Sequence, residues 1–273
     1  MKFETIYDRE NAIFRDIMNM STPEERELFV SDGLCWADIK CGEKLPQDTY
    51  IEMEGIYLCS SPRIVFLCKE PNNASGEDYR DWHWSESTSN ILFRDSIALW
   101  LKGLLSISND NSPILQAIKE NRYIFSSIPV AIMNVKKYSG GNKSDWSVIF
   151  NHAERFARQL REQLDLYSPD IIVCCGSSDN EKEELNNKMI KIAKRYLYPD
   201  LSFDKINNFC HYCIDKQLLL IDSYHPSYNV CNEWKFDKMF EYYYEFRKEY
   251  SFLEWQNIKT RIKIQKDSVK FNS

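Results

Sequence analysis

The chain has 273 residues, of which 43% are hydrophobic, and it carries a formal net charge of −6 at pH 7. This length and apolar content suit one large domain with a buried core, and the acidic balance argues against a surface coated with positive charge for non-specific nucleic-acid binding. We expect a cytoplasmic protein without membrane contact, because no apolar run reaches the roughly 18 residues of a membrane span and the segment Met1 to Thr5 does not resemble a secretory signal.

Nine cysteines, an odd number, are scattered along the chain, which fits a reducing compartment better than a disulfide framework. Cys210 and Cys213 have the spacing of half a metal site, and Cys35 with Cys41 would form a poorly spaced second half. A structural metal therefore stays open as an alternative, and we predict a protein without a metal or another cofactor.

Residues 1–62 are predicted to form a helical extension packed on the core. Residues 5–20 approximate an amphipathic helix, and a second helix begins at Thr22-Pro23-Glu24-Glu25, where Thr22 caps the helix and Glu25 completes a capping box. A weak strand is predicted around Tyr50 to Leu58.

Residues 63–250 alternate short apolar runs with helical patterns. Four runs are predicted as buried strands, at 64–68, 129–135, 170–175 and 217–222. Helices are predicted at about 89–106, from the end of the loop 136–145 to about 166, and from about 231 to 250. Strands and helices that alternate at this spacing predict an α/β domain whose parallel sheet has helices on both faces. The basic tail, 251–273, is either a solvated end or an arm that contacts phosphates.

Polar residues follow three of these strands. They are Glu70-Pro71 after the first, Asn134 with Lys137 after the second, and His225-Pro226-Ser227 after the fourth. A parallel sheet brings the carboxyl ends of its strands to one edge, which is where open α/β sheets bind ligands. We therefore expect one site that contains all three segments.

These segments resemble, in the same order, the motifs of the uracil-DNA glycosylase superfamily. The chain has Cys68-Lys69-Glu70-Pro71, then Met133-Asn134-Val135-Lys136-Lys137, then Tyr224-His225-Pro226-Ser227-Tyr228, and the middle segment looks most like that of the iron–sulfur branches. The resemblance covers about residues 63–230. It implies a three-layer α/β/α sandwich with a central four-stranded parallel sheet.

The chain departs from the family pattern at three positions of the first motif. Cys68 replaces a glycine, Glu70 replaces a shorter Asp or Asn, and Asn72 stands where one branch has a tyrosine that excludes large bases. The cysteines that hold the family's iron–sulfur cluster have no clear counterparts. Because Asn72 takes the place of that tyrosine, strict selectivity for uracil is not expected.

Hydrolysis of an N-glycosidic bond needs a carboxylate or positioned water on the sugar side and donors on the base side. Glu70 is predicted to orient water and His225 to donate a hydrogen bond to the departing base; the alternatives are a salt-bridged or helix-capping carboxylate and a structural histidine. Asn134 is predicted to read the base edge, Asn72 to border the base pocket, and Trp82 or Trp84 to stack on the base, unless they only pack beneath a loop.

A second group of residues is predicted to hold the DNA around a flipped nucleotide. Phosphate contacts are assigned to the residues Lys137, Ser139, Ser177, Ser223 and Ser227. Tyr228 or Asn229 is assigned to fill the gap in the duplex, in the position of the family's wedge. Each phosphate-contact residue, taken alone, fits an ordinary surface or turn position better than a functional one.

The sequence thus predicts a monomeric DNA glycosylase that removes a pyrimidine-type base, either uracil or a bulky modified cytosine. Excision of a modified cytosine from phage DNA would be antiviral defence, and excision of uracil would be repair. A protein of the same fold that binds nucleic acid or a nucleotide without hydrolysing it is the alternative.

Overall fold

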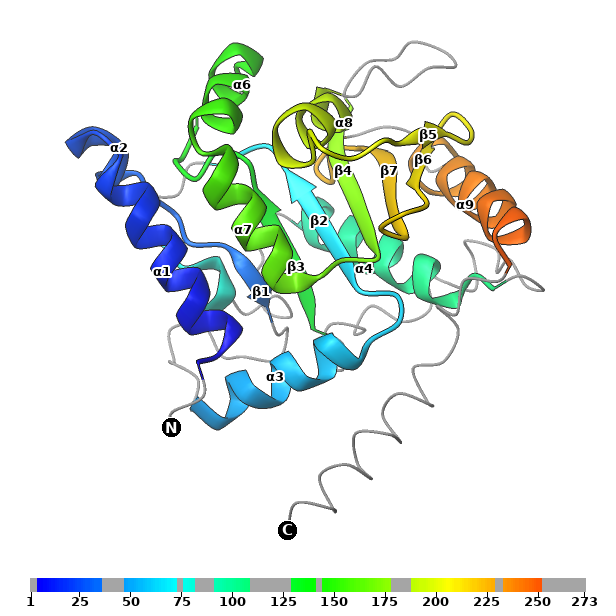
Figure 1. The fold of residues 1–273 in the computed structure, drawn as a ribbon, viewed down its shortest axis with the longest axis horizontal. Coiled ribbons are helices and arrows are strands. Elements are labelled where there is room, and N and C mark those ends of the chain that lie inside the picture. Colours follow the sequence, from blue (N-terminus) through cyan, green and yellow to red (C-terminus); the bar gives the residue numbers. More distant parts are fainter. Residues whose placement is uncertain are drawn as a thin grey trace.

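The computed structural model describes residues 4–35, 47–72, 76–81, 91–108, 129–140, 144–177, 188–228 and 233–251. These residues form an α/β fold around a mixed seven-stranded sheet with the order β1-β3-β2-β4-β7-β6-β5 (Figure 1). The strands are β1 (Gly33–Cys35), β2 (Ile64–Cys68), β3 (Val130–Asn134), β4 (Ile171–Ser177), β5 (Asp204–Lys205), β6 (Cys210–Cys213) and β7 (Leu218–Tyr224).

Four neighbouring strands, β3, β2, β4 and β7, run parallel, and their positions match the four predicted strands. The central register is given by Phe66, which lies opposite Ile132 of β3 and Val173 of β4. The expectation of only four strands was incomplete. Strand β1 adds to β3 in antiparallel orientation at one edge, and β6 with β5 extends the sheet beyond β7 in the same way.

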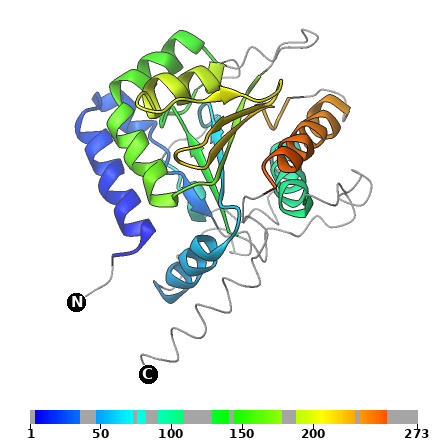
Figure 2. The same ribbon diagram turned by 45° about the vertical axis from the view of Figure 1, so that its right-hand side comes forward.

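Helices cover both faces of the sheet, as Figure 2 shows with α4 and α9 on one side and α1, α6 and α7 on the other. The first face carries α4 (Ile91–Ser106), the π-helical turn η4 (Glu233–Asp237) and α9 (Lys238–Glu249). The second face carries α1 (Ile6–Asn19), α6 (Trp146–Arg155), α7 (Ala157–Tyr167), α8 (Lys188–Ile192) and the π-helical turn η3 (Ala193–Leu197). The remaining elements are α2 (Pro23–Glu27), α3 (Gln47–Cys59) and the short η1 (Tyr79–Asp81).

Alternation along each central strand divides the core into two layers. On β2, Val65 and Leu67 pack with α1, α6 and α7, whereas Phe66 packs with α4 and α9. All three side chains are fully buried, so the strand reads as a continuous apolar run. Helices α4 and α9 approach closely at Gly103, where an added Cβ would lie 2.2 Å from the ring of Phe240.

The N-terminal helices begin as predicted. Thr22 caps α2 in a capping box with Glu25, and α1 has a similar box formed by Thr5 and Asp8. The weak strand predicted around 50–58 is wrong, because this stretch lies in α3. Its buried residues Tyr50, Met53 and Tyr57 follow the three-to-four-residue spacing of a helix.

The N-terminal segment is tied into the core by a buried ion pair. The Arg80 guanidinium donates to Glu10 of α1 at 2.9 Å, and both side chains are only 1% exposed. The same Glu10 carboxylate accepts from the hydroxyl of Tyr167 on α7 and, at 3.1 Å, from the backbone N–H of Leu34 on β1. Residues before the predicted boundary at 62 therefore share a core with the rest of the domain; the predicted tail beyond 251 lies outside the described residues.

None of the helices in the described segments combines the length and the apolar character that crossing a lipid bilayer requires.

Candidate active site at the carboxyl edge of the sheet

The order of the parallel strands reverses its direction between β2 and β4. From β2 the chain passes to β3 on one side, through α4, and from β4 it passes to β7 on the other side, through α8. These connections cover opposite faces, since α4 and α8 belong to different core layers. In open α/β sheets such a reversal leaves a ligand-binding crevice at the carboxyl ends of the two strands. Lys69 and Glu70 follow β2 directly at this place.

The Glu70 carboxylate is held by Lys136. The Lys136 ammonium lies 2.5 Å from Glu70 Oε2, and the two side chains are 11% and 7% exposed. Pairing between the loops continues past the strands, because Lys136 N–H donates to Lys69 O at 2.9 Å and Gly140 N–H donates to Pro71 O at 3.1 Å. The other carboxylate oxygen of Glu70, Oε1, is buried and has no hydrogen-bond partner in the described part of the chain. It is a buried acceptor just beyond the carboxyl end of β2.

Four polar side chains form the last row of the sheet on the α4 and α9 face: Asn134, Cys68, Cys175 and Ser223. Register places Cys68 opposite Asn134 and Cys175 opposite Ser223, and the two thiols interact. Burial raises the pKa of the Cys175 thiol, so this thiol is neutral at physiological pH.

Asn134 is buried, and its position is secured through its backbone. Its N–H donates to Asp32 Oδ2 at 2.8 Å, while its carboxamide makes no hydrogen bond within the described segments. A buried carboxamide that is not engaged by the protein can offer one acceptor and two donors to a ligand.

His225 follows β7 and is held in one tautomer. Ser227 N–H donates to Nδ1 at 3.3 Å, so the neutral ring carries its proton on Nε2. Burial, together with the charges of Lys69 and Lys235, lowers the pKa of His225 to about 3. The ring is therefore neutral at physiological pH and presents a single N–H donor. Phe93 of α4 lies against it, with ring centroids 6.0 Å apart.

Lys235 supports the loop that carries His225. Its buried ammonium donates to the carbonyls of Pro226 and Tyr228, and Ser96 of α4 donates to the same Pro226 carbonyl at 2.9 Å. Burial lowers the pKa of Lys235 to about 8. The backbone of this loop is thus attached to both η4 and α4.

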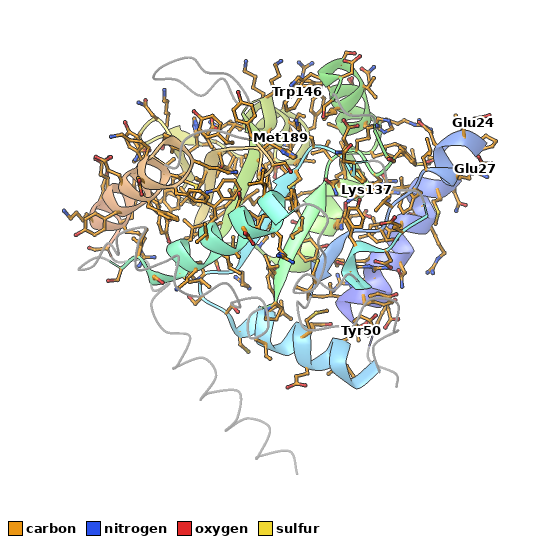
Figure 3. The ribbon with its side chains drawn as sticks, turned by 180° about the vertical axis from the view of Figure 1, so that it is seen from behind. Glu24, Glu27, Tyr50, Lys137, Trp146 and Met189 are labelled. Carbon is orange, nitrogen blue, oxygen red and sulfur yellow. The ribbon has the colours of Figure 1, made fainter. Side chains whose placement is uncertain are left out.

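Lys137, predicted to contact phosphate, lies elsewhere. Its side chain is 1% exposed and its ammonium pairs with Asp32 at 2.5 Å, beneath α1 and near the ring of Phe14. Figure 3 shows Lys137 inside the molecule. The lysine that the structure brings to Glu70 is the preceding residue, Lys136.

The other predicted residues are distributed around the same edge. Asn72 bridges to Gly140 and is exposed, Ser227 is exposed, Ser223 is buried, and Ser139 is partly exposed. The Tyr228 ring stacks on Tyr224 at 5.9 Å, and Ser177 ends β4. Trp82, Trp84 and Asn229 lie outside the described residues.

The described residues contain no group of three or more histidine, cysteine, aspartate or glutamate side chains arranged to hold a metal ion. Cys210 and Cys213 are the two ends of β6, and Cys41 is outside the described segments. Three positions along a strand place two side chains on opposite faces. The spacing of Cys210 and Cys213 is therefore that of two residues in a strand, β6, which pairs with β7.

Sequence reasoning did not select four residues that shape this site: Lys136, Asp32, Lys235 and Lys69. Lys136 had a signal, since it lies in the quoted middle motif. Lys69 likewise lies in the quoted first motif. Asp32 acts on Asn134, which is far away in the chain, and Lys235 binds the carbonyls of Pro226 and Tyr228, nine and seven residues before it.

A search with models of known protein families gave no match, and a search of curated protein sequences gave none either.

Proposed function

We propose that this chain is a DNA glycosylase that hydrolyses the N-glycosidic bond of a pyrimidine-type base and leaves an abasic site. The observation that carries the proposal is the buried Glu70 Oε1, which has no partner among the described residues and lies just beyond β2, where the strand order reverses. The resemblance to the uracil-DNA glycosylase superfamily supports the assignment, because Glu70, Asn134 and His225 stand in its three motifs. The run of four parallel strands is consistent with the three-layer fold that this resemblance implies.

In this proposal Glu70 acts on the sugar side of the bond. Its Oε1 accepts a hydrogen bond from a water molecule whose oxygen attacks C1′, and its negative charge stabilises the cation that develops on the sugar. Lys136 fixes the other oxygen, so the carboxylate cannot rotate away. The C1′–N bond breaks with its electron pair on the base, and the proton that the attacking water loses passes by way of Glu70 and solvent to the departed base.

His225 and Asn134 act on the base side. A neutral His225 donates from Nε2 to the base oxygen on which negative charge accumulates, and it does so without first losing a proton. The carboxamide of Asn134 pairs with the edge of the base, where its donor and acceptor distinguish one pyrimidine from another. Asn72, exposed beside Gly140, is a small side chain at the border of the pocket and leaves room for a bulky modified cytosine such as those of phage DNA.

The test is a panel of oligonucleotides, single-stranded and duplex, that carry uracil or modified cytosines, with abasic sites detected by alkaline cleavage. We expect abasic sites with at least one member, and Glu70→Gln is expected to lower the rate by about 10²-fold or more. Glu241→Gln, an exposed carboxylate paired with Lys238, serves as the matched control and should leave the rate unchanged. Absence of abasic sites with every member would refute the proposal.

The second candidate is a protein that binds nucleic acid or a nucleotide without hydrolysis. The tight pairing of Glu70 with Lys136 favours it, since a largely buried ion pair can hold the two loops together without acting on a ligand. Binding that persists in Glu70→Gln and His225→Ala, together with no abasic sites from the wild type, would establish this candidate.

A further inference from the structure

Trp146 lies between two lysines beside the candidate site. It is the first residue of α6 and is partly exposed, with the ammonium of Lys69 at 5.7 Å and that of Lys188 at 5.2 Å from its ring. Lys69 immediately precedes Glu70, and Lys188 is the first residue of α8. Three separate segments therefore meet at the end of the molecule toward which β2 points, where Figure 3 labels Trp146 (Figures 1 and 3).

The contacts continue away from the site. Phe150 lies one helical turn beyond Trp146, with ring centroids 6.4 Å apart, and Tyr196 of η3 follows at 6.3 Å. The exposed guanidinium of Arg195 lies 5.1 Å from the Tyr196 ring. We call this set the aromatic–basic track: Lys69, Trp146, Phe150, Lys188, Arg195 and Tyr196.

The three rings of the track pack against the core and remain partly exposed. Trp146, Phe150 and Tyr196 each pack with one side against the core under α6 and α7, yet each is partly exposed. Asp145, the residue before Trp146, is engaged by the N–H and hydroxyl of Ser147, and Glu70, the residue after Lys69, is paired with Lys136. Lys69, Lys188 and Arg195 thus place three cations within 5.7 Å of these rings, in a protein whose net charge is −6.

The lysine contacts with Trp146 are loose. Ammonium groups bind aromatic faces out to about 6 Å, so both separations lie near the limit of the interaction. A planar base can replace an ammonium against the ring at low cost, and the displaced ammonium then meets the phosphate of the same nucleotide. Aromatic faces interleaved with cations are the arrangement by which proteins bind single strands, since every unpaired base has a face to stack.

We propose that the aromatic–basic track binds single-stranded nucleic acid and leads the strand to Glu70. The inference rests on the proposed function for its direction, because the track begins at the residue before Glu70. It goes beyond that function by predicting that the substrate is single-stranded. In a duplex the base faces are covered by their neighbours, so the rings of the track would have nothing to stack on.

The first experiment measures binding of labelled oligonucleotides by fluorescence anisotropy. The oligonucleotides contain thymine as their only base, so they offer no uracil or modified cytosine for cleavage. We expect single strands to bind more tightly than the matching duplex. Trp146→Ala and Tyr196→Ala are each expected to weaken single-strand binding by about 5- to 150-fold. Trp146→Phe keeps a ring and should bind nearly as the wild type does, which separates stacking from a folding defect.

Charge is tested through salt dependence. Three phosphate contacts predict a slope of about −2 for log affinity against log salt, and Lys188→Ala should reduce its magnitude by about 0.7. Lys248→Ala on α9 is the matched control, since its ammonium lies 4.5 Å from the Tyr244 ring on another face. Comparison with a ribothymidine oligonucleotide, which has the same base on the RNA sugar, distinguishes DNA from RNA as the natural strand.

The outcomes separate this inference from the proposed function. Track-dependent binding without any abasic sites would leave the inference standing and refute the glycosylase. Abasic sites formed by a protein whose binding is unchanged in Trp146→Ala would refute the track alone. Tighter binding to the duplex than to the single strand would also overturn it, in favour of a double-stranded substrate.

Discussion

The Glu70 carboxylate occupies the space next to Gly140 in which a side chain on residue 140 would begin. A Cβ built at Gly140 would lie 2.2 Å from Glu70 Oε2 and 2.4 Å from Cδ, far inside van der Waals contact. A glycine in the loop after β3 thus permits the loop after β2 to bring its carboxylate to Lys136. The two loops depend on each other for the geometry of the site.

Gly140→Ala is therefore expected to push the Glu70 carboxylate away from Lys136. We expect a stability loss of about 1 to 3 kcal/mol, typical of overpacking, together with loss of abasic-site formation. Gly55→Ala in α3 is the control, since nothing lies within 4 Å of its added methyl group and a helix gains from alanine. Urea unfolding measures both variants, and an unchanged midpoint for Gly140→Ala would contradict the packing described here.

Asp32 is expected to be a large contributor to stability. Asp32→Ala would leave the Lys137 ammonium buried without its carboxylate, and would remove the acceptor of the Asn134 N–H. Loss of one member of a buried pair typically costs about 3 to 5 kcal/mol. In urea unfolding, Lys137→Met should cost less in the Asp32→Ala background than alone. Simple additivity of the two losses would show that the residues are not coupled.

The contact between α4 and α9 gives a prediction that is independent of the site. Gly103→Ala directs a methyl group into the Phe240 ring at 2.2 Å, so we expect a loss of about 1 to 3 kcal/mol. Phe240→Leu alone should also destabilise by leaving a gap. The double variant should recover part of the loss from Gly103→Ala, and thermal unfolding of all three proteins would show it. A double variant as unstable as the sum of both changes would rule out this contact.

Stability is expected to fall as the pH drops from about 6.5 toward 4. Burial lowers the pKa of His152 to about 4, with Glu25 opposing and Lys136 and Arg155 adding to the shift, so the unfolded chain takes up a proton that the folded chain rejects. This proton uptake lowers the stability through that interval, by on the order of 2 kcal/mol for a well-buried ring. His152 packs against Phe156, and His152→Phe should reduce the slope in urea unfolding between pH 4.5 and 7.5, while His211 and His225, whose pKa values are also lowered, keep their own contributions. An identical slope in the variant would exclude this cause.

The four parallel strands were predictable because burial on both faces demands continuous apolar runs, such as Ile64 to Cys68. The edge strands were not. Strands β1, β5 and β6 have three, two and four residues, too short for a periodic pattern to separate them from a loop. Their pairing is decided by the neighbouring strands and not by their own sequence.

The strand-end position of Glu70, Asn134 and His225 was predictable in the same way, because parallel topology gathers the carboxyl ends. The choice between Lys136 and Lys137 was not, since adjacent residues in a turn point in different directions. Asp32 pairs with Lys137 and holds it away from Glu70, and it lies 105 residues before Lys137 in the chain. No local pattern carries such information.

The antiparallel pairing of β1 with β3 has a consequence for how the chain reaches its fold during synthesis. Gly33 pairs with Ile132, so the first strand emerges about a hundred residues before its partner exists. Until then Glu10 and Asp32 have no Tyr167 or Lys137 to meet, and the N-terminal helices cannot complete their contacts. The N-terminal segment can therefore complete its contacts only after the middle of the chain has been synthesised. A shortened protein that starts at residue 63 would lack β1, so one edge of β3 would be unpaired, and it would lack Asp32, which neutralises Lys137.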